Sequence, residues 1–564
     1  MKKLNVIFNC ILQIFFVIIF LSTLKAKNLD KFNKGNYISD YFSGILLLNE
    51  NKYNKSYEYL KNLDGLEENH INYSTNYIYS LVNSEKINEA FIYSKKLEKK
   101  SLDTFQSDLI TGVFYLKRKN FDLAKKYFLK IKNRNSKFLL DDFLTDSLLN
   151  WSSLSNLNLA SAQNNIEVMS TKFENLKEIQ KVFLHCYYQS QKTELLFKKL
   201  ISNKKVDFSR YNYFYVSYLV GLKNIERAKA IISSSTDLYP NNLLLQQLNI
   251  DFEKGKFKSD FNCQNQSHTI AEIFYITANA MSTQRMYRLS NFYLNLAKYL
   301  NDDFQTFETL LAENYFNIEN FELALKIYGK IEKKGGAYEW YSAKQIAKIL
   351  IEQKKKKQAV TFLEERYEKF IDRNIYDKFN YAEFLKSNEQ FKKSIEIYTE
   401  IINSIKKTHE LYPEASDARG VAFERIGEWE RAEKDFLSSL ESNPNQAYVI
   451  NYLAYSWIEK GIKIKKSLGM LEKANKLKSN DPFIVDSLGW ALFKLERYED
   501  SKKYLQMAVQ LMPADPVIND HYGDVLWKSG NNIQARYYWN YVLNLEETKP
   551  DLKENIKNKL LSGI

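Results

Sequence analysis

Small residues and large apolar residues recur at a fixed interval along the chain. Ser501 and Ala535 lie 34 residues apart, and each is followed four positions later by a large apolar residue, Leu505 and Trp539. Spacings of three and four put side chains on one face of an α-helix, and a small side chain there lets a second helix approach closely. A fixed period of this length predicts a stack of helix–turn–helix units.

The small residue of each unit can be followed back toward the N-terminus. Intervals of 34 or 35 residues are the most frequent, and a shortened unit accounts for the 62 residues that precede Ser290. The positions are Ser56, Ala90, Ala124, Ala228, Ser290, Ala324, Ala359, Ser394, Ala432, Ser467, Ser501 and Ala535. Glycine or proline at the junctions ends one helical hairpin and begins the next. The pattern predicts an all-α fold in which each unit touches only its neighbours.

This unit resembles that of the tetratricopeptide repeat (TPR) family, which has glycine at its eighth position, alanine at its twentieth and proline near its end. The resemblance covers roughly residues 35–550 and is most regular from residue 301 onward. It implies an all-α, right-handed superhelical solenoid of about 15 TPR-like helix–turn–helix units. Three blocks are also similar to the C-terminal ends of bacterial cell-envelope TPR proteins: Asn451–Tyr455, Asp486–Trp490 and Asn519–Asp524.

The chain begins with a segment typical of export. Lys2 and Lys3 precede an apolar run from Val6 to Leu24, and Ala26 offers a small residue for cleavage. This order is that of a secretory signal peptide. The run is also close to the ~20 residues that a membrane anchor requires, so both alternatives stay open. We expect an exported protein that is periplasmic, or membrane-anchored and facing the periplasm.

Differences in regularity divide the chain into four segments. They are a signal peptide or N-terminal anchor (1–26), degenerate TPR-like helical repeats (27–300), a regular TPR array (301–549) and a C-terminal tail (550–564). Six of seven prolines and five of seven tryptophans lie at or beyond residue 413, so the C-terminal units are the most sharply delimited. We expect the segment from about 300 to 550 to fold alone, because well-matched units stabilise one another.

The net charge of +13 does not alter this prediction. The 81 basic and 68 acidic residues are interleaved, and the densest basic run, Lys354–Lys357, falls at a predicted turn. A solvated turn explains such a run better than a nucleic-acid surface does. We expect no nucleic-acid partner, and at most a weak peripheral attraction to anionic membranes. The sequence does not determine the oligomeric state.

Catalytic and metal-binding patterns are absent from the sequence. None of the five histidines belongs to an HExxH pair, and no GxSxG or P-loop occurs. His521 stands beside Asp520 and near Asp524, which could form an acid–base pair, but no nucleophile accompanies them. We predict no enzyme, no catalytic residue, no metal site and no cofactor.

Two cysteines, Cys186 and Cys263, lie outside the apolar N-terminal run. They are 77 residues apart, which is about two repeats. Residues so far apart in a solenoid rarely come within disulfide range. We expect two separate, buried cysteines.

The family resemblance also implies a binding surface. In TPR proteins the first helix of each unit lines the concave groove, and the corresponding residues here are Asp417, Asn451, Tyr455, Asp486, Trp490, Asp520, His521, Asp524 and Trp527. This face is acidic and aromatic, so it suits a basic or apolar segment better than a partner's C-terminal carboxylate. In the alternative interpretation, Trp490 and Trp527 only join neighbouring helices.

Two functions are consistent with these features. The first is a non-enzymatic scaffold or adaptor of the bacterial cell envelope, which binds partner proteins or peptides in the concave groove. The alternative is an accessory subunit of a secretion, polysaccharide-export or protease complex, which presents substrate to an enzyme.

Overall fold

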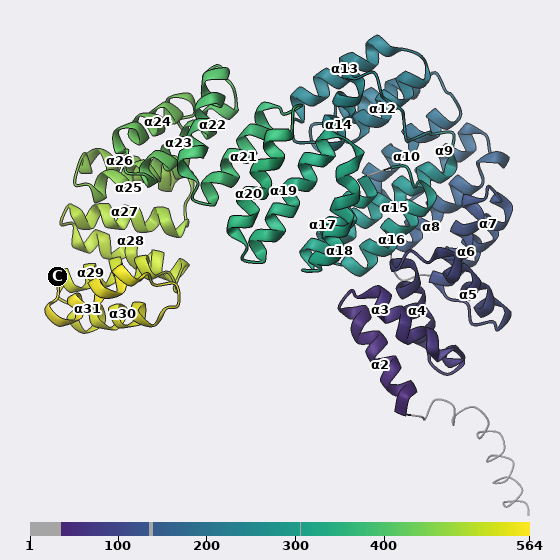
Figure 1. The fold of residues 1–564 in the computed structure, drawn as a ribbon, viewed down its shortest axis with the longest axis horizontal. Coiled ribbons are helices and arrows are strands. Elements are labelled where there is room, and N and C mark those ends of the chain that lie inside the picture. The colour runs from purple at the N-terminus through teal and green to yellow at the C-terminus, as the bar shows by residue number, and fades with distance from the viewer. Residues whose placement is uncertain (1–34, 135–138, 305) are drawn as a thin grey trace, which may run out of the picture. The chain divides into compact units, whose positions relative to one another are not determined.

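The computed structural model describes residues 35–134, 139–304 and 306–564, and every regular element in them is a helix (Figure 1). The predicted signal peptide or anchor, residues 1–26, lies outside the described residues. The all-α prediction is confirmed, and the chain is a helical-repeat solenoid. It forms two compact units, the first ending at Asp372 and the second spanning Arg373–Ile564. No described helix is both long and apolar enough to cross a membrane.

The first unit contains nineteen of the described α-helices. They are α2 (Gly35–Asn49), α3 (Tyr53–Leu60), α4 (Ile71–Asn83), α5 (Ile87–Lys99), α6 (Phe105–Lys117), α7 (Phe121–Lys132), α8 (Leu139–Ser152), α9 (Leu159–Glu167), α10 (Glu174–Tyr187), α11 (Thr193–Ile201), α12 (Tyr211–Gly221), α13 (Ile225–Leu238), α14 (Leu243–Glu253), α15 (Gln266–Thr283), α16 (Tyr287–Leu300), α17 (Thr306–Asn317), α18 (Phe321–Ile331), α19 (Gly336–Glu352) and α20 (Lys356–Lys369). Short 3₁₀ helices lie at Lys61–Leu63, Leu66–Glu68, Leu154–Asn156, Thr171–Phe173 and Glu332–Lys334.

The second unit is a regular stack of hairpins followed by one further helix. Its helices are α21 (Ile375–Ser387), α22 (Phe391–Ser404), α23 (Leu411–Arg425), α24 (Trp429–Ser442), α25 (Ala447–Glu459), α26 (Ile464–Leu477), α27 (Pro482–Lys494), α28 (Tyr498–Leu511), α29 (Pro516–Lys528), α30 (Asn532–Asn544) and α31 (Pro550–Ser562). Pro482 and Pro516 stand at the first helical position, where proline lacks only an N–H that the helix would leave unbonded. The predicted C-terminal tail, residues 550–564, is thus mostly the helix α31.

Close contact between the two helices of a hairpin explains the period in the sequence. The anchor Ser501 is fully buried, and its hydroxyl donates to the Gly489 carbonyl oxygen at 2.7 Å. A Cβ atom on Gly489 would lie 2.7 Å from the Leu505 side chain. The glycine, the small anchor and the large residue that follows it therefore form one contact, repeated along the stack.

From α17 onward, the turn inside each hairpin contains a residue with a positive φ angle, and the α25–α26 turn has a second one, Lys463. In consecutive hairpins these residues are Glu319, Lys354, Glu389, Gly427, Gly461, Glu496 and Gly530. Lys354 lies in the turn between α19 and α20, where the sequence predicted a solvated turn. Because several of these positions are not glycine, the turns are less visible in the sequence than the helices.

The first unit is not a linear stack. The α15–α16 hairpin packs against α4, α6 and α8, although about 200 residues of chain separate α16 from α4 (Figure 1). Asn295 donates to the Asn83 side-chain oxygen at 3.3 Å, and Arg288 donates to the Asn49 side-chain oxygen at 3.1 Å. The expectation that each unit touches only its neighbours is wrong here, because the N-terminal repeats close onto a hairpin far along the chain.

A disulfide bond joins Cys186 and Cys263, whose Cα atoms are 5.9 Å apart. The expectation of two separate cysteines is therefore wrong. The segment between α14 and α15 is long and irregular, and it folds back against α10 and α12. Phe261 in this segment contacts the rings of Phe183 and Phe214, with centroids 5.0 and 4.5 Å apart. This return brings Cys263 to the end of α10.

Candidate partner-binding face

The first helices of the second unit carry one polar residue each at equivalent positions. We call this set the polar ladder: Glu383, Asp417, Asn451, Asp486 and Asp520, one each on α21, α23, α25, α27 and α29. Successive members are 34 or 35 residues apart, and successive first helices are in contact for α21–α23, α25–α27 and α27–α29. Equivalent positions in stacked repeats face the same side of the stack. Glu383 is not among the residues predicted for the face, although it stands one period before Asp417.

The fourth position of the ladder is paired with a histidine. The Nδ1 atom of His521 lies 2.9 Å from an Asp486 carboxylate oxygen, and both side chains are buried. The His521 ring stacks on Trp490 with a centroid distance of 3.9 Å. Burial alone would lower the pKa of His521, but the neighbouring Asp486 carboxylate outweighs it and the pKa is raised. The arrangement favours the charged imidazolium.

The fifth position is paired with a lysine from α31. The Lys559 ammonium donates to Asp520 at 2.7 Å and to both carboxylate oxygens of Asp524 at 2.8 Å. The Trp539 indole N–H also donates to Asp524, at 3.1 Å. Burial and the adjacent Asp520 charge raise the pKa of Asp524 to about 6, although Lys559 opposes this shift. Helix α31, in the segment predicted to be a tail, thus supplies a cation to one end of the predicted face.

The two tryptophans of the predicted face join helices. Trp490 is 7% exposed, and its indole N–H donates to Glu459 of α25 at 2.6 Å. Trp527 of α29 contacts the Trp539 ring of α30 with centroids 5.5 Å apart. A Cβ atom on Gly563, just after α31, would lie 2.1 Å from the Trp527 ring. Both rings are therefore largely engaged within the chain.

The middle of the ladder differs from its C-terminal end. Among the described residues, no hydrogen bond or ion pair reaches the partly buried Asp417 carboxylate. Burial raises the pKa of Asp417 to about 6, and Glu383 adds to the shift while Lys386 opposes it. On the next first helix, the Asn451 side-chain oxygen is buried and accepts no hydrogen bond. A buried polar atom without a partner is costly, so these two groups mark a place where a ligand can supply donors.

Tyr455 extends this unpaired region toward the occupied end. Its ring centroid lies 6.4 Å from that of His521, and the hydroxyl makes no hydrogen bond within the described residues. Burial raises its pKa, so the hydroxyl stays protonated and can donate. Of the nine residues predicted for the face, Asp417, Asn451 and Tyr455 thus make no side-chain hydrogen bond within the described residues, and the Trp527 indole N–H also lacks one.

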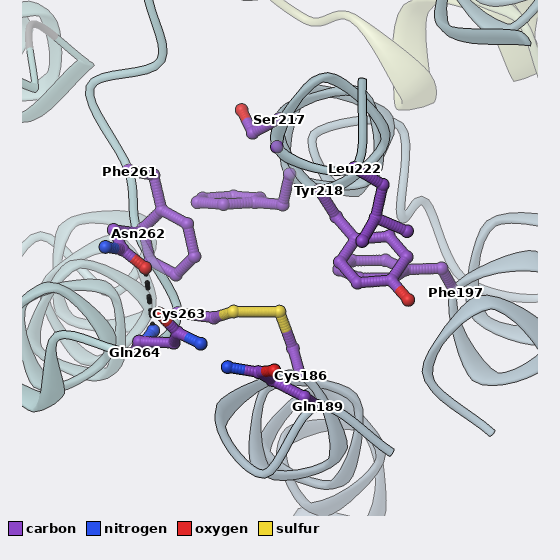
Figure 2. Close-up of a pocket in the computed structure, with 12 residues that line it drawn as sticks. Cys186, Gln189, Phe197, Ser217, Tyr218, Leu222, Phe261, Asn262, Cys263 and Gln264 are labelled. Atoms are coloured by element: carbon purple, nitrogen blue, oxygen red, sulfur yellow. Dashed lines mark hydrogen bonds between the residues drawn. A yellow bond between two sulfur atoms is a disulfide. The ribbon is translucent and has the colours of Figure 1, made fainter. Parts of the chain in front are cut away.

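The first unit contains a separate pocket of about 410 Å³ beside the disulfide. Figure 2 shows Cys186 and Cys263 along one wall, with the rings of Phe197, Tyr218 and Phe261 around the space. None of the predicted site residues lies here. The sequence gives no sign of this pocket, because the spacing of Cys186 and Cys263 does not reveal that they are joined.

The described residues offer no group of three or more histidine, cysteine, aspartate or glutamate side chains that could hold a metal ion. His521 is the histidine for which an acid–base role was considered. Its ring is 6% exposed, stacked on Trp490 and held by Asp486. These contacts account for its position.

Comparison with known proteins supports the repeat assignment. No family model matches the chain. A curated TPR repeat-containing protein of Pseudomonas aeruginosa is 27% identical over 146 residues, which are 25% of this chain and 23% of that protein. The matched stretch thus covers less than a quarter of the relative's length. The resemblance to TPR proteins that the sequence indicated is confirmed.

Solved structures of TPR proteins also match parts of the chain. MamA from Desulfovibrio magneticus is 20% identical and covers 31% of this chain and 97% of its own, with a TM-score of 0.28. A tetratricopeptide repeat protein from Parabacteroides merdae is 14% identical and covers 39% of this chain and 87% of its own, with a TM-score of 0.33. The assignment of the fold rests on the helices of the chain itself.

Proposed function

We propose that this chain is a non-enzymatic scaffold of the bacterial cell envelope, and that its second unit binds an extended basic segment of a partner protein along the polar ladder. The likeness to TPR proteins supports a protein-interaction scaffold in general. The observation that supports the finer proposal is the contrast within the ladder: Asp417 and Asn451 lack partners, whereas Asp486 and Asp520 hold cationic side chains of the chain itself.

The ladder positions that are already paired, Asp486 and Asp520, indicate which partner groups would suit the unpaired positions Asp417 and Asn451. A carboxylate that loses water on binding needs a charge-assisted donor, since burying it unpaired is expensive. Lys559 supplies such a donor to Asp520, and His521 supplies one to Asp486. A lysine or arginine side chain of a partner would do the same for Asp417. The Asn451 oxygen would accept an N–H from the same segment.

The proposal is tested by binding of an extended, fluorescently labelled peptide in which lysine alternates with serine, against a matched peptide with glutamate in place of lysine. Asp417→Lys is expected to weaken binding of the lysine peptide by about tenfold or more, because it places like charges together. Glu547→Lys is the control, since Glu547 is exposed in the turn before α31 and the charge change is the same. Equal weakening by both variants, or equal binding of both peptides, would contradict the ladder as the site.

Export to the envelope is supported by two further observations. The sequence carries an apolar run from Val6 to Leu24, and Cys186 and Cys263 form a disulfide, a bond that persists in oxidising compartments. We expect the native protein in the periplasmic or membrane fraction, with neither of these two cysteines open to maleimide before reduction. A cytoplasmic protein with both thiols reactive would refute export.

A further inference from the structure

The outer face of α2 carries an uncovered apolar stripe. Ile38, Phe42 and Leu46 are 50%, 66% and 60% exposed, and their spacing of four places them on one side of the helix. The opposite side, with Gly44 and Leu48, is buried. An exposed row of large apolar side chains on one helix marks a surface that contacts another molecule or a membrane.

The residues immediately before α2 indicate that the stripe contacts a membrane rather than another protein. Residues 25–34 contain four lysines and one aspartate, and they follow directly on the apolar run that ends at Leu24. Ten residues span at most about 35 Å when fully extended. If the run is kept as an anchor, α2 must lie within that distance of the bilayer. If the run is removed by cleavage at Ala26, three of the four lysines still precede α2.

We propose that α2 lies in the interface of an anionic bilayer, with Ile38, Phe42 and Leu46 turned into the lipid. A helix with an apolar face and neighbouring basic residues binds in this way, since the apolar side chains enter the acyl boundary while the lysines meet anionic headgroups. Next to the stripe, Ser39 is exposed and Ser43 is half-buried, and both suit the headgroup level. This inference rests on the export proposed above, but not on the polar ladder.

The second unit provides a matched comparison. On α30, Ile533, Tyr537 and Tyr541 are 88%, 68% and 37% exposed and have the same spacing of four. The residues before α30 include Lys528 but form no basic run like that before α2. An apolar stripe alone would make both helices bind lipid, whereas our inference assigns lipid contact to α2.

The test uses the full chain with Cys10→Ser, reconstituted into vesicles of phosphatidylethanolamine and phosphatidylglycerol. A polarity-sensitive fluorophore is attached at Phe42→Cys or, as the control, at Tyr537→Cys. We expect lipid-attached quenchers to quench the probe at position 42 at least threefold more than the probe at 537. We also expect this quenching to fall in phosphatidylcholine vesicles and at high salt. Because no peptide is added, the result is independent of binding at Asp417.

Three outcomes would overturn the inference. Equal quenching at both positions would show that lipid contact is not specific to α2. A probe at position 42 that stays open to aqueous iodide would show that the stripe faces water. A probe protected from both lipid quenchers and iodide would show that protein covers the stripe. If that protection depended on protein concentration, a second copy of the chain would be what covers the stripe. If the protection did not depend on concentration, the N-terminal segment would be what covers it.

Discussion

At the scale of single residues, the unpaired carboxylate of Asp417 works against stability. Burial raises its pKa to about 6, above the 3.8 of an ordinary aspartate. A raised pKa means that the folded chain binds this proton more tightly than the unfolded chain does. The free energy of unfolding is therefore highest below the pKa of the unfolded state, and it falls as the pH rises through the pKa of the folded state. A residue that destabilises the fold at neutral pH and faces the predicted surface is a candidate for function.

We therefore predict that Asp417→Asn stabilises the second unit at pH 8, by about 1 kcal/mol in the free energy of unfolding. This figure is less than the full pKa difference would give, because the side chain is only partly buried. The gain should shrink toward zero near pH 4, where aspartate is itself neutral. Denaturant unfolding followed by tryptophan fluorescence measures both values, and Glu547→Gln serves as control. A loss of stability at pH 8 would contradict the cause assigned to the pKa shift.

Lys559 has the opposite role, because it neutralises two buried carboxylates. Replacing it with methionine leaves Asp520 and Asp524 without their cation, and we expect a loss of about 3 kcal/mol at pH 8. The loss should be smaller at pH 5, below the pKa of about 6 that Asp524 has in the intact site, because that carboxyl then binds a proton. Lys557→Met on the exposed side of α31 is the matched control. A loss that does not depend on pH would indicate that Lys559 acts through packing rather than charge.

At the scale of helices and hairpins, local patterns were predictable and distant contacts were not. The contact of Gly489, Ser501 and Leu505 lies within one hairpin, so its spacing is visible in the sequence. The packing of α16 on α4 and the return of Cys263 to α10 join segments far apart in sequence, and no period encodes them. The binding face shows the same difference. The repeat spacing located Asp486 and Asp520, but it did not reveal that Lys559 of α31 pairs with Asp520.

The disulfide gives a prediction about these distant contacts. It closes a loop of about 77 residues, so removing it with Cys186→Ala and Cys263→Ala should lower the free energy of unfolding of the first unit by about 3 kcal/mol. Hydrogen exchange followed by mass spectrometry should show faster exchange in α10 and α15 in the double variant. Peptides from α27 in the second unit are the internal control. Unchanged exchange in α10 would show that aromatic packing around Phe261 holds the segment without the crosslink.

At the scale of the whole chain, regularity of the sequence and compactness of the structure give different boundaries. The repeat pattern becomes regular at residue 301, whereas the compact units divide between Asp372 and Arg373. Helices α17–α20 are regular in sequence yet belong to the first unit, where α17 packs on α16 and α19 packs on α14. The period describes how each hairpin is built, and it does not record which distant helices the hairpin contacts.

This difference leads to a prediction about fragments. The fragment 373–564 should unfold cooperatively on its own, because core clusters such as that of Leu505, Trp539 and Ile556 lie wholly within it. The fragment 301–549, which the sequence pattern favoured, loses the partners of α17 and α19 and also the α31 lysine that neutralises Asp520 and Asp524. We expect it to show a lower and broader melting transition by circular dichroism. The opposite result would be that 301–549 melts as sharply as 373–564 and at as high a temperature. The limits of the folding unit would then be set by the regularity of the repeats and not by the contacts with α14, α16 and α31.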